Sequence, residues 1–361
     1  MAKKNIRAAS FRNEYSQLLV PLVALALIIL FNLFRDPGFF SISLAKNNVG
    51  NTVLQGNLIS ILNGASELTI LAMGMTLVTA ACGGQDISVG AVAAIAGSVF
   101  VKVLRSGASI TPLTVVMGIV LGCVVAMLFS AFSGTLVAVF KIQPMIATLI
   151  LYTCGRSIAY WINGGASPTV ESPIITNIGS FIPGIPLPTP IMIVVLMGII
   201  FALIFRFTNL RLYTQTVGIN QGAARLNGIN SVGIKMLSFI LLGACCAVAG
   251  IIGVCRMSYL NHETLLLDVE MDAILAVAIG GNLLGGGKFK MVGSVLGAYA
   301  IQALTITLYA MKVPSTDIKA YKAIVIILIV MAGSPVVKDA ISRTWKKLIG
   351  KSGLKSWKEA A

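Results

Sequence analysis

The sequence predicts an all-α fold, a polytopic membrane bundle of about ten transmembrane helices with both termini in the cytoplasm. Composition carries this prediction. Hydrophobic residues make up 57 % of the 361-residue chain and charged residues only 11 %, whereas soluble domains contain about 45–50 % and about 25 %. The mean hydropathy is +0.92. One globular core cannot bury that much apolar surface, so the excess must face lipid.

Apolar runs that approach the roughly 20 residues of a membrane-spanning helix recur along the whole chain. The expected spans are 17–34, 57–81, 87–103, 112–140, 144–161, 189–205, 234–255, 270–287, 290–311 and 320–333. They divide the chain into a cytoplasmic N-terminal segment (1–16), one membrane domain (17–333) and a basic cytoplasmic tail (334–361). The segments between spans are too short to form a separate soluble core.

The formal net charge of +15 indicates orientation rather than binding to nucleic acid. With the N-terminus placed in the cytoplasm, most Lys and Arg fall on the inner side and most acids on the outer side. That asymmetry is the positive-inside pattern. A basic inner surface also favours contact with anionic membrane lipid.

An inner connection, 206–235, carries bases and no acids, and it contains the helix-prone stretch "QGAARL" (221–226). Gly218 and Gly228 bracket that stretch, and Asn220 is available as its N-cap. So short a helix does not fold alone. Either another protein docks against it or the connection is a solvated linker.

The sequence offers no catalytic or metal-binding constellation. Its one histidine, His262, lies in an outer loop, and "HETLL" lacks the second histidine of a zinc-binding HExxH helix. Neither "IGKS" nor "GGGKF" has the spacing of a phosphate-binding loop. The six cysteines form no CxxC pattern. We therefore expect no enzymatic activity and no cofactor on this chain.

A few polar side chains in or beside the spans are candidates for a path or gate through the bundle: Asn63, Glu67, Gln143, Arg156 and Asn282. Ionisable groups inside a membrane are costly and are functional candidates by default. Arg156 lies near the outer end of its span, however, and its aliphatic stem can carry the guanidinium to the interface. A pair between Glu67 and Arg156 would offset both penalties. Asn63 and Gln143 are more often hydrogen bonders between helices.

The stretch "CGGQDISVG" (82–90) joins two apolar runs at the inner side. Gly83 and Gly84 can end one helix, because glycine accepts positive φ freely. Asp86 is then expected to cap the next helix, near the positive end of the helix dipole. Contact with a partner protein or a gate is the alternative. The sequence gives no physical reason for Gln85.

Four stretches in order carry a family resemblance: "AMGMTLVTAACGGQDISVGAVAAIAGS" (72–98), "KIQPMIATLILYTCGRS" (141–157), "VGINQGAARLNGIN" (217–230) and "MDAILAVAIGGNLLGGGKFKMVGSVLGAYAIQ" (271–302). Together they resemble the permease subunits of bacterial ABC importers for sugars of the ribose, galactose and galactofuranose type. The second stretch looks most like the galactofuranose permeases.

The chain also departs from the family pattern. The family commonly has an apolar residue where Gln85 stands before Asp86. Where it commonly reads "GGTSLSGG", this chain has "GGNLLGGG", which brings Asn282. Glu67 matches no acid associated with the family. These departures leave the identity of the sugar open.

The resemblance implies a subunit that moves a monosaccharide from a periplasmic or lipid-anchored binding protein into the cytoplasm by alternating access. It implies a second permease subunit, identical or related, and a cytoplasmic ABC ATPase that uses ATP and Mg²⁺. The expected location is the bacterial inner membrane. The 217–230 stretch matches the coupling segment, which would dock on the ATPase through Gly222, Ala223, Ala224, Arg225, Gly228 and Ile229. The alternative is an ion-coupled secondary transporter of a small polar solute, with Glu67 near glycine-broken helices.

Overall fold

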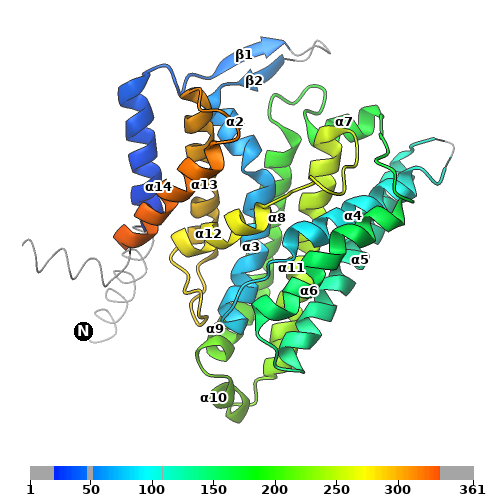
Figure 1. The fold of residues 1–361 in the computed structure, drawn as a ribbon, viewed down its shortest axis with the longest axis vertical. Coiled ribbons are helices and arrows are strands. Elements are labelled where there is room, and N and C mark those ends of the chain that lie inside the picture. Colours follow the sequence, from blue (N-terminus) through cyan, green and yellow to red (C-terminus); the bar gives the residue numbers. More distant parts are fainter. Residues whose placement is uncertain (1–19, 47–51, 108, 334–361) are drawn as a thin grey trace, which may run out of the picture.

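The computed structural model describes residues 20–46, 52–107 and 109–333. Within these ranges the chain forms a helical bundle with one short β-hairpin (Figure 1). The hairpin lies at one end of the molecule's long axis and helix α10 lies at the other. We call these the hairpin end and the α10 end. The expected N-terminal segment (1–16) and basic tail (334–361) lie outside the described residues.

The helices follow the expected apolar runs and add shorter elements between them. They are a first helix Val20–Arg35, then α2 (Asn57–Gly64), α3 (Ser66–Cys82), α4 (Val89–Leu104), α5 (Pro112–Ala138), α6 (Pro144–Ile162), α7 (Pro173–Gly179), α8 (Thr189–Phe207), α9 (Leu210–Ile219), α10 (Gln221–Leu226), α11 (Ser231–Met257), α12 (Val269–Ile279), α13 (Met291–Ala310) and α14 (Ile318–Gly333).

Several of these helices are shorter than a full membrane span. In the described part of the chain, 5 helices are long and apolar enough to cross a membrane: α5, α6, α8, α11 and α13. The pair α2 and α3 makes a sixth if the two count as one span, bent by 41°. The first helix and α4 are apolar but short. The prediction of a helical membrane bundle therefore stands in its coarse form, whereas about ten full spans stays a prediction.

The expected span 270–287 is wrong in its second half. α12 ends at Ile279, and a glycine-rich loop of residues 280–290 leads to α13. Gly281, Gly286 and Gly287 in that loop have positive φ, which a helix does not allow. With 11 residues, α12 rises only about 16 Å, roughly half of a hydrocarbon core about 30 Å thick.

The all-α prediction also missed the hairpin. Ser43–Lys46 (β1) pairs antiparallel with Thr52–Gln55 (β2). The backbone N–H of Leu54 donates to the carbonyl of Pro186 at 3.0 Å. This bond ties the hairpin to the proline-containing connection between α6 and α8, which also holds α7.

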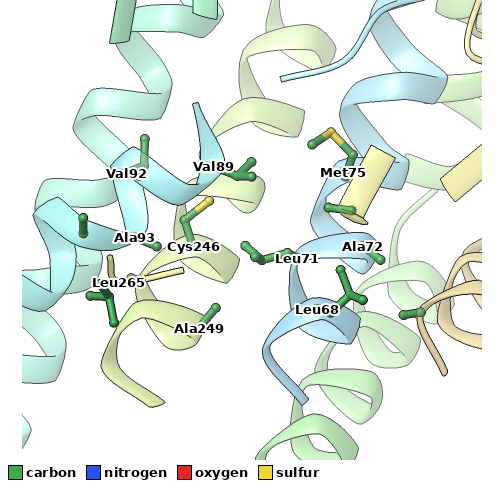
Figure 2. Close-up of a cluster of buried hydrophobic side chains, with 14 of the residues drawn as sticks. Leu68, Leu71, Ala72, Met75, Val89, Val92, Ala93, Cys246, Ala249 and Leu265 are labelled. Atoms are coloured by element: carbon green, nitrogen blue, oxygen red, sulfur yellow. The ribbon is translucent and has the colours of Figure 1, made fainter. Parts of the chain in front are cut away.

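Helix α11 is the centre of the bundle and packs against α5, α3 and α4. Small residues allow the close approach, as is usual for helices in membranes. A Cβ on Gly250 of α11 would stand 2.2 Å from the carbonyl oxygen of Ala93 in α4. Figure 2 shows the apolar contacts that follow, with Leu71 of α3 and Val89 of α4 around Cys246 of α11.

The peripheral helices turn apolar side chains outward. Exposed examples are Leu128 and Phe132 on α5, Ile150 on α6, and Leu196 and Leu203 on α8. Continuous apolar surface of this kind suits lipid or another hydrophobic protein rather than water.

Two ion pairs join α14 to α12. Lys322 Nζ lies 2.6 Å from a carboxylate oxygen of Asp272, and both side chains are largely shielded from solvent. One helical turn earlier on α14, Lys319 pairs with Asp268, and both of these side chains are more exposed. The two pairs help to fix α14 beside α12.

Candidate functional site

The connection 206–235 forms the α10 end of the molecule. The expected short helix is confirmed as α10, Gln221–Leu226, and so is its cap: Asn220 Oδ1 accepts a hydrogen bond from the Ala223 N–H at 3.0 Å. Gly228 follows the helix with a φ of 77°. Gly218 is not a break before α10, as the sequence suggested, because it lies inside α9.

Most of the predicted docking residues are on the free surface of this helix. Gly222, Ala223 and Arg225 are exposed on α10, and Gly228 is exposed just after it. Ala224 is the exception, since it is fully buried. It therefore supports α10 from beneath and offers nothing to a partner. Ile229 is half-buried.

The sequence reasoning overlooked Leu226, whose side chain is 91 % exposed at the tip of α10. An apolar side chain so exposed at the end of a helical bundle is typical of a protein contact. The sequence shows that residue 226 is apolar. It does not show that the side chain points outward, because a six-residue helix has too few turns for an apolar stripe to define a buried face.

Polar contacts hold α10 on the start of α11. Ser231 Oγ accepts hydrogen bonds from Arg225 Nε at 2.8 Å and from Gln221 Nε2 at 3.2 Å. Lys235 Nζ donates to Gln221 Oε1 at 3.0 Å. Because the same side chains that face outward also bind α11, a force on α10 acts directly on that helix.

Asp86 does not occupy the N-cap position of α4; Ser88 does. The carboxylate of Asp86 instead accepts two hydrogen bonds from Ser88, at 2.7 Å from its N–H and at 2.6 Å from its hydroxyl. Asp86 is 1 % exposed. It therefore fixes the residue that starts α4 rather than the first turn of the helix itself.

Gln85 now has a physical explanation. Its Nε2 donates to the carbonyl of Leu284 at 3.0 Å, so it ties the 83–88 segment to the 280–290 loop. An apolar residue at this position could not make that bond. No signal in the sequence connects two segments this far apart.

Asn282 holds the 280–290 loop together. Its Oδ1 accepts from the Lys290 N–H at 2.7 Å, and its Nδ2 donates to Ser294 Oγ at 2.8 Å. Thr76 of α3 donates to the same Ser294 hydroxyl at 2.7 Å. Burial and the neighbouring Lys288 lower the pKa of Lys290 to about 8. The side-chain amide of Asn282 therefore makes its hydrogen bonds within the loop and to the start of α13.

Glu67 pairs with Arg256 of α11, and not with Arg156, which the sequence had left open as a partner. Arg256 Nε lies 3.0 Å from Glu67 Oε1, and its Nη2 lies 3.2 Å from Oε2. The same Nη2 donates to the Asn63 carbonyl at 2.9 Å. Asn63 and Glu67 flank the bend between α2 and α3, so Arg256 bridges the bend.

Arg156 organises the loop between α11 and α12. Its Nη1 lies within hydrogen-bond distance of the carbonyls of His262 (3.0 Å), Glu263 (2.9 Å) and Leu265 (3.1 Å). The half-buried guanidinium therefore binds loop carbonyls, and the expected position of Arg156 at the membrane interface stays a prediction. No local sequence signal shows which carbonyls the Arg156 guanidinium meets.

Beside Arg156, the first turns of α4 and α12 meet at Gly90. A Cβ on Gly90 would stand 2.5 Å from Glu270 Oε2 and 3.3 Å from Arg156 Nη2. Glu270 is 1 % exposed. Glycine at position 90 therefore leaves the space that this buried carboxylate occupies.

Gln143 is the N-cap residue of α6 and is exposed at the start of that helix. It lies far along α6 from Arg156. The five polar candidates thus fall into separate places: Asn63 and Glu67 at the α2–α3 bend, Arg156 by the α11–α12 loop, and Asn282 and Gln143 toward the α10 end.

Among the described residues, no group of three or more His, Cys, Asp and Glu side chains could hold a metal ion. Glu67, Asp86 and Asp272 are engaged with Arg256, Ser88 and Lys322, whereas Glu270 Oε2 is buried without a hydrogen-bond partner. The arrangement serves packing and mechanical connection between helices.

The model of a family described as "Branched-chain amino acid transport system / permease component" matches residues 57–333. The chain belongs to this permease family. The match covers α2 to α14, which is nearly the whole described bundle.

Curated relatives of the permease transport sugars. It is 39 % identical over 315 residues to the galactofuranose transporter permease protein YtfT of Escherichia coli K12, covering 87 % of this chain and 88 % of that one. It is 31 % identical over 340 residues to the fructose import permease FruF of Bifidobacterium longum, covering 92 % of each. It is 34 % identical over 317 residues to the ribose import permease RbsC of E. coli K12, covering 86 % and 91 %. These matches confirm the resemblance to sugar permeases of ABC importers. No solved structure matches the permease significantly.

Proposed function

We propose that the permease imports a monosaccharide across the bacterial inner membrane as one subunit of an ABC importer. The single observation that carries the proposal is α10. It is a capped and anchored helix that presents Ala223, Arg225 and Leu226 to the outside at one end of a membrane bundle. A helix built in this way suits docking into a groove of another protein. Its basic side chain can pair with an acid there.

In this proposal the α10 end is cytoplasmic and the hairpin end faces the periplasm, with both termini inside. The excess of Lys and Arg assigned to the inner side supports that orientation. The partners are an ABC ATPase at the α10 end, a second copy or close relative of the permease in the membrane, and a sugar-binding protein at the hairpin end. The ATPase supplies ATP and Mg²⁺ chemistry, and this chain binds neither. Nucleic acid is not a partner.

The sugar is galactofuranose or a monosaccharide of similar size, such as ribose, galactose or fructose. The three relatives named above carry galactofuranose, fructose and ribose in their names, and the identity is highest to the galactofuranose permease. Of the polar path candidates, Asn63 beside the bend and Gln143 at the start of α6 are the two that we retain. Glu67, Arg156 and Asn282 serve the structure around the path.

Uptake by proteoliposomes tests the proposal. The permease is reconstituted with the ABC ATPase and the secreted binding protein encoded beside it, and labelled galactose, ribose and fructose are compared with ATP inside or outside the vesicle. We expect uptake of one of these sugars only when ATP reaches the ATPase. Uptake driven by an ion gradient without the ATPase would instead support the secondary-transporter alternative and refute the proposal.

Charge reversal at α10 locates the coupling contact. R225E should abolish uptake and sugar-stimulated ATP hydrolysis while the protein still inserts in the membrane. R105E is the matched control, because Arg105 is also exposed but lies just after α4. If R225E transports normally, α10 does not dock on the ATPase through this residue.

A further inference from the structure

Helix α4 begins in the middle of the bundle and not at its α10 end. α4 runs alongside α6, since Asn163 just beyond α6 donates to the Ser98 carbonyl at 3.1 Å. Gly155 of α6 contacts Ala91, in the first turn of α4. Gly155 lies 11 positions after Pro144, the first residue of α6, which is about 16 Å along the helix.

Residues 83–88 and the first turn of α4 together cover this distance. Residues 83–88 have no helical structure, and we call them the extended segment. At its start, Gly84 packs on Pro144, where a Cβ would stand 2.8 Å from the proline ring. Near its end, the Ile87 N–H donates to Thr148 Oγ1 at 3.2 Å. The extended segment and α4 therefore form one discontinuous span. Its non-helical half, nearer the α10 end, carries Gln85 and Asp86.

The end of α3 and the extended segment both contact the backbone of the 280–290 loop. The Gly287 N–H donates to the Ala80 carbonyl at 3.0 Å. A Cβ on Gly286 would stand 2.8 Å from the Cα of Gly83. The Gln85 bond to Leu284 adds a third connection. Apart from the Gln85 side chain, these contacts are made by backbone atoms, so the two segments cannot separate without breaking them.

The C-terminal end of α9 touches the same place. A Cβ on Gly218 would stand 1.8 Å from the Ala80 carbonyl oxygen and 2.7 Å from the Gly287 nitrogen. Only one residue, Asn220, separates α9 from α10. We call Gly83, Gly218, Gly286 and Gly287 the glycine junction.

We infer that the glycine junction is the mechanical relay through which the docked ATPase moves the discontinuous span and the 280–290 loop together. A movement of α10 passes through Gly218 to the backbone that joins α3, the loop and the extended segment. The inference rests on the proposed function and adds to it the route by which force enters the membrane. A purely structural role for these glycines is the competing explanation.

The variant G218A separates the two explanations. A methyl group at this position must displace α9 from Ala80 and Gly287, because backbone atoms cannot move aside as a flexible side chain can. The matched control is G198A in α8, also a helix glycine, where the nearest atom to a Cβ is Met73 Cε at 3.9 Å. Both changes raise helix propensity by the same type of substitution.

The measurements are ATP hydrolysis, sugar uptake and thermal unfolding of the assembled importer. We expect G218A to assemble and hydrolyse ATP within about twofold of wild type while its uptake falls at least tenfold, and G198A to match wild type. Unchanged uptake per ATP in G218A would overturn the inference. A proportional loss of uptake, hydrolysis and melting temperature in G218A would overturn it as well, in favour of a structural role.

Q85L keeps the inference testable if G218A does not fold, since it removes a single hydrogen bond between the extended segment and the loop. Uptake should fall severalfold at constant ATP hydrolysis, and unchanged uptake would refute the relay.

Failure of the proposed function has a different signature: wild type itself then shows no ATP-dependent uptake. If wild type transports and R225E does not, but both relay variants behave as wild type, the function stands and the relay does not.

Discussion

Arg256 binds Glu67 and Asn63 simultaneously, with its Nε 3.0 Å from Glu67 Oε1 and its Nη2 2.9 Å from the Asn63 carbonyl. One side chain at the end of α11 thus clamps both sides of the α2–α3 bend. The bend has no side-chain cap of its own on α3. The clamp replaces the backbone bonds that a continuous helix would have made.

Breaking this clamp should lower stability without abolishing transport. E67Q leaves the Arg256 guanidinium without its carboxylate, and we expect a loss of about 1–3 kcal/mol in the free energy of unfolding in detergent, because a hydrogen-bonded charge loses its partner. R256M should cost a similar amount. The double variant should cost less than the sum of the two. Additive losses would show that the two side chains do not interact, and loss of uptake by stably folded E67Q would restore Glu67 as a path residue.

The ion pairs between α12 and α14 should differ in their contribution to stability. Lys322 and Asp272 are shielded, at 16 % and 23 % side-chain exposure, so K322M should destabilise by about 1–3 kcal/mol. Lys319 is 70 % exposed, and K319M should change the unfolding midpoint far less, since solvent screens exposed pairs. Exchanging the charges in K322D/D272K should recover part of the loss. Equal effects of K319M and K322M would contradict this ranking.

The Asn220 cap should matter for docking more than for the fold. N220A removes the acceptor of the Ala223 N–H, and loss of an N-cap costs about 1 kcal/mol. In a six-residue helix that is enough to fray the first turn, so affinity for the ATPase should fall by roughly fivefold. N220S retains a capping oxygen and serves as the control. Binding of detergent-solubilised permease to immobilised ATPase measures both variants.

Arg156 should be required for order in the loop between α11 and α12. R156M removes the bonds to three carbonyls, and backbone amides of residues 259–268 should then exchange hydrogen faster. R156K retains the positive charge but lacks the planar guanidinium with its several N–H donors. It should therefore restore only part of the protection of these amides against hydrogen exchange. Exchange rates measured by mass spectrometry report on this loop directly. Unchanged protection in R156M would mean that the loop is held by its other contacts alone.

Lys290 should make stability rise with pH in the alkaline range. Its pKa in the folded protein is about 8, below the ordinary 10.5. Between these two values the unfolded chain binds more protons than the native protein, so the free energy of unfolding increases with pH. K290M lacks the titrating group and should lose that part of the slope. Unfolding midpoints from pH 7.5 to 10 test this, and identical slopes would exclude a role for Lys290.

Local signals were sufficient to predict α10. Asn220 and Gly228 mark its boundaries through conformations that those residue types favour, and the structure places the helix between them. The apolar runs likewise predicted the long helices, because burial in lipid depends on composition more than on partners. Capping and hydrophobicity are properties of a short stretch, and a sequence displays them directly.

Properties that depend on two distant segments could not be predicted. Arg256 and Arg156 both lie in the C-terminal halves of their helices, and nothing in the sequence says which of them meets Glu67. The run 270–287 is mostly apolar beyond Asp272, so hydropathy alone did not reveal that α12 stops at Ile279. The glycines of the 280–290 loop indicate where the helix ends, because they adopt positive φ angles that a helix does not allow.

The shortness of α12 also constrains how the chain is made. A helix of about 16 Å cannot leave the translocation channel as an independent span, and its first turn carries Glu270 and Asp272. It becomes stable in lipid only after α13 has been synthesised, since Gly280 and Gly293 bring the two backbones into contact, and after Lys322 of α14 has reached Asp272. We therefore expect α12, α13 and α14 to enter the membrane as one unit, so a ribosome that stalls before α14 would leave Asp272 of α12 without Lys322.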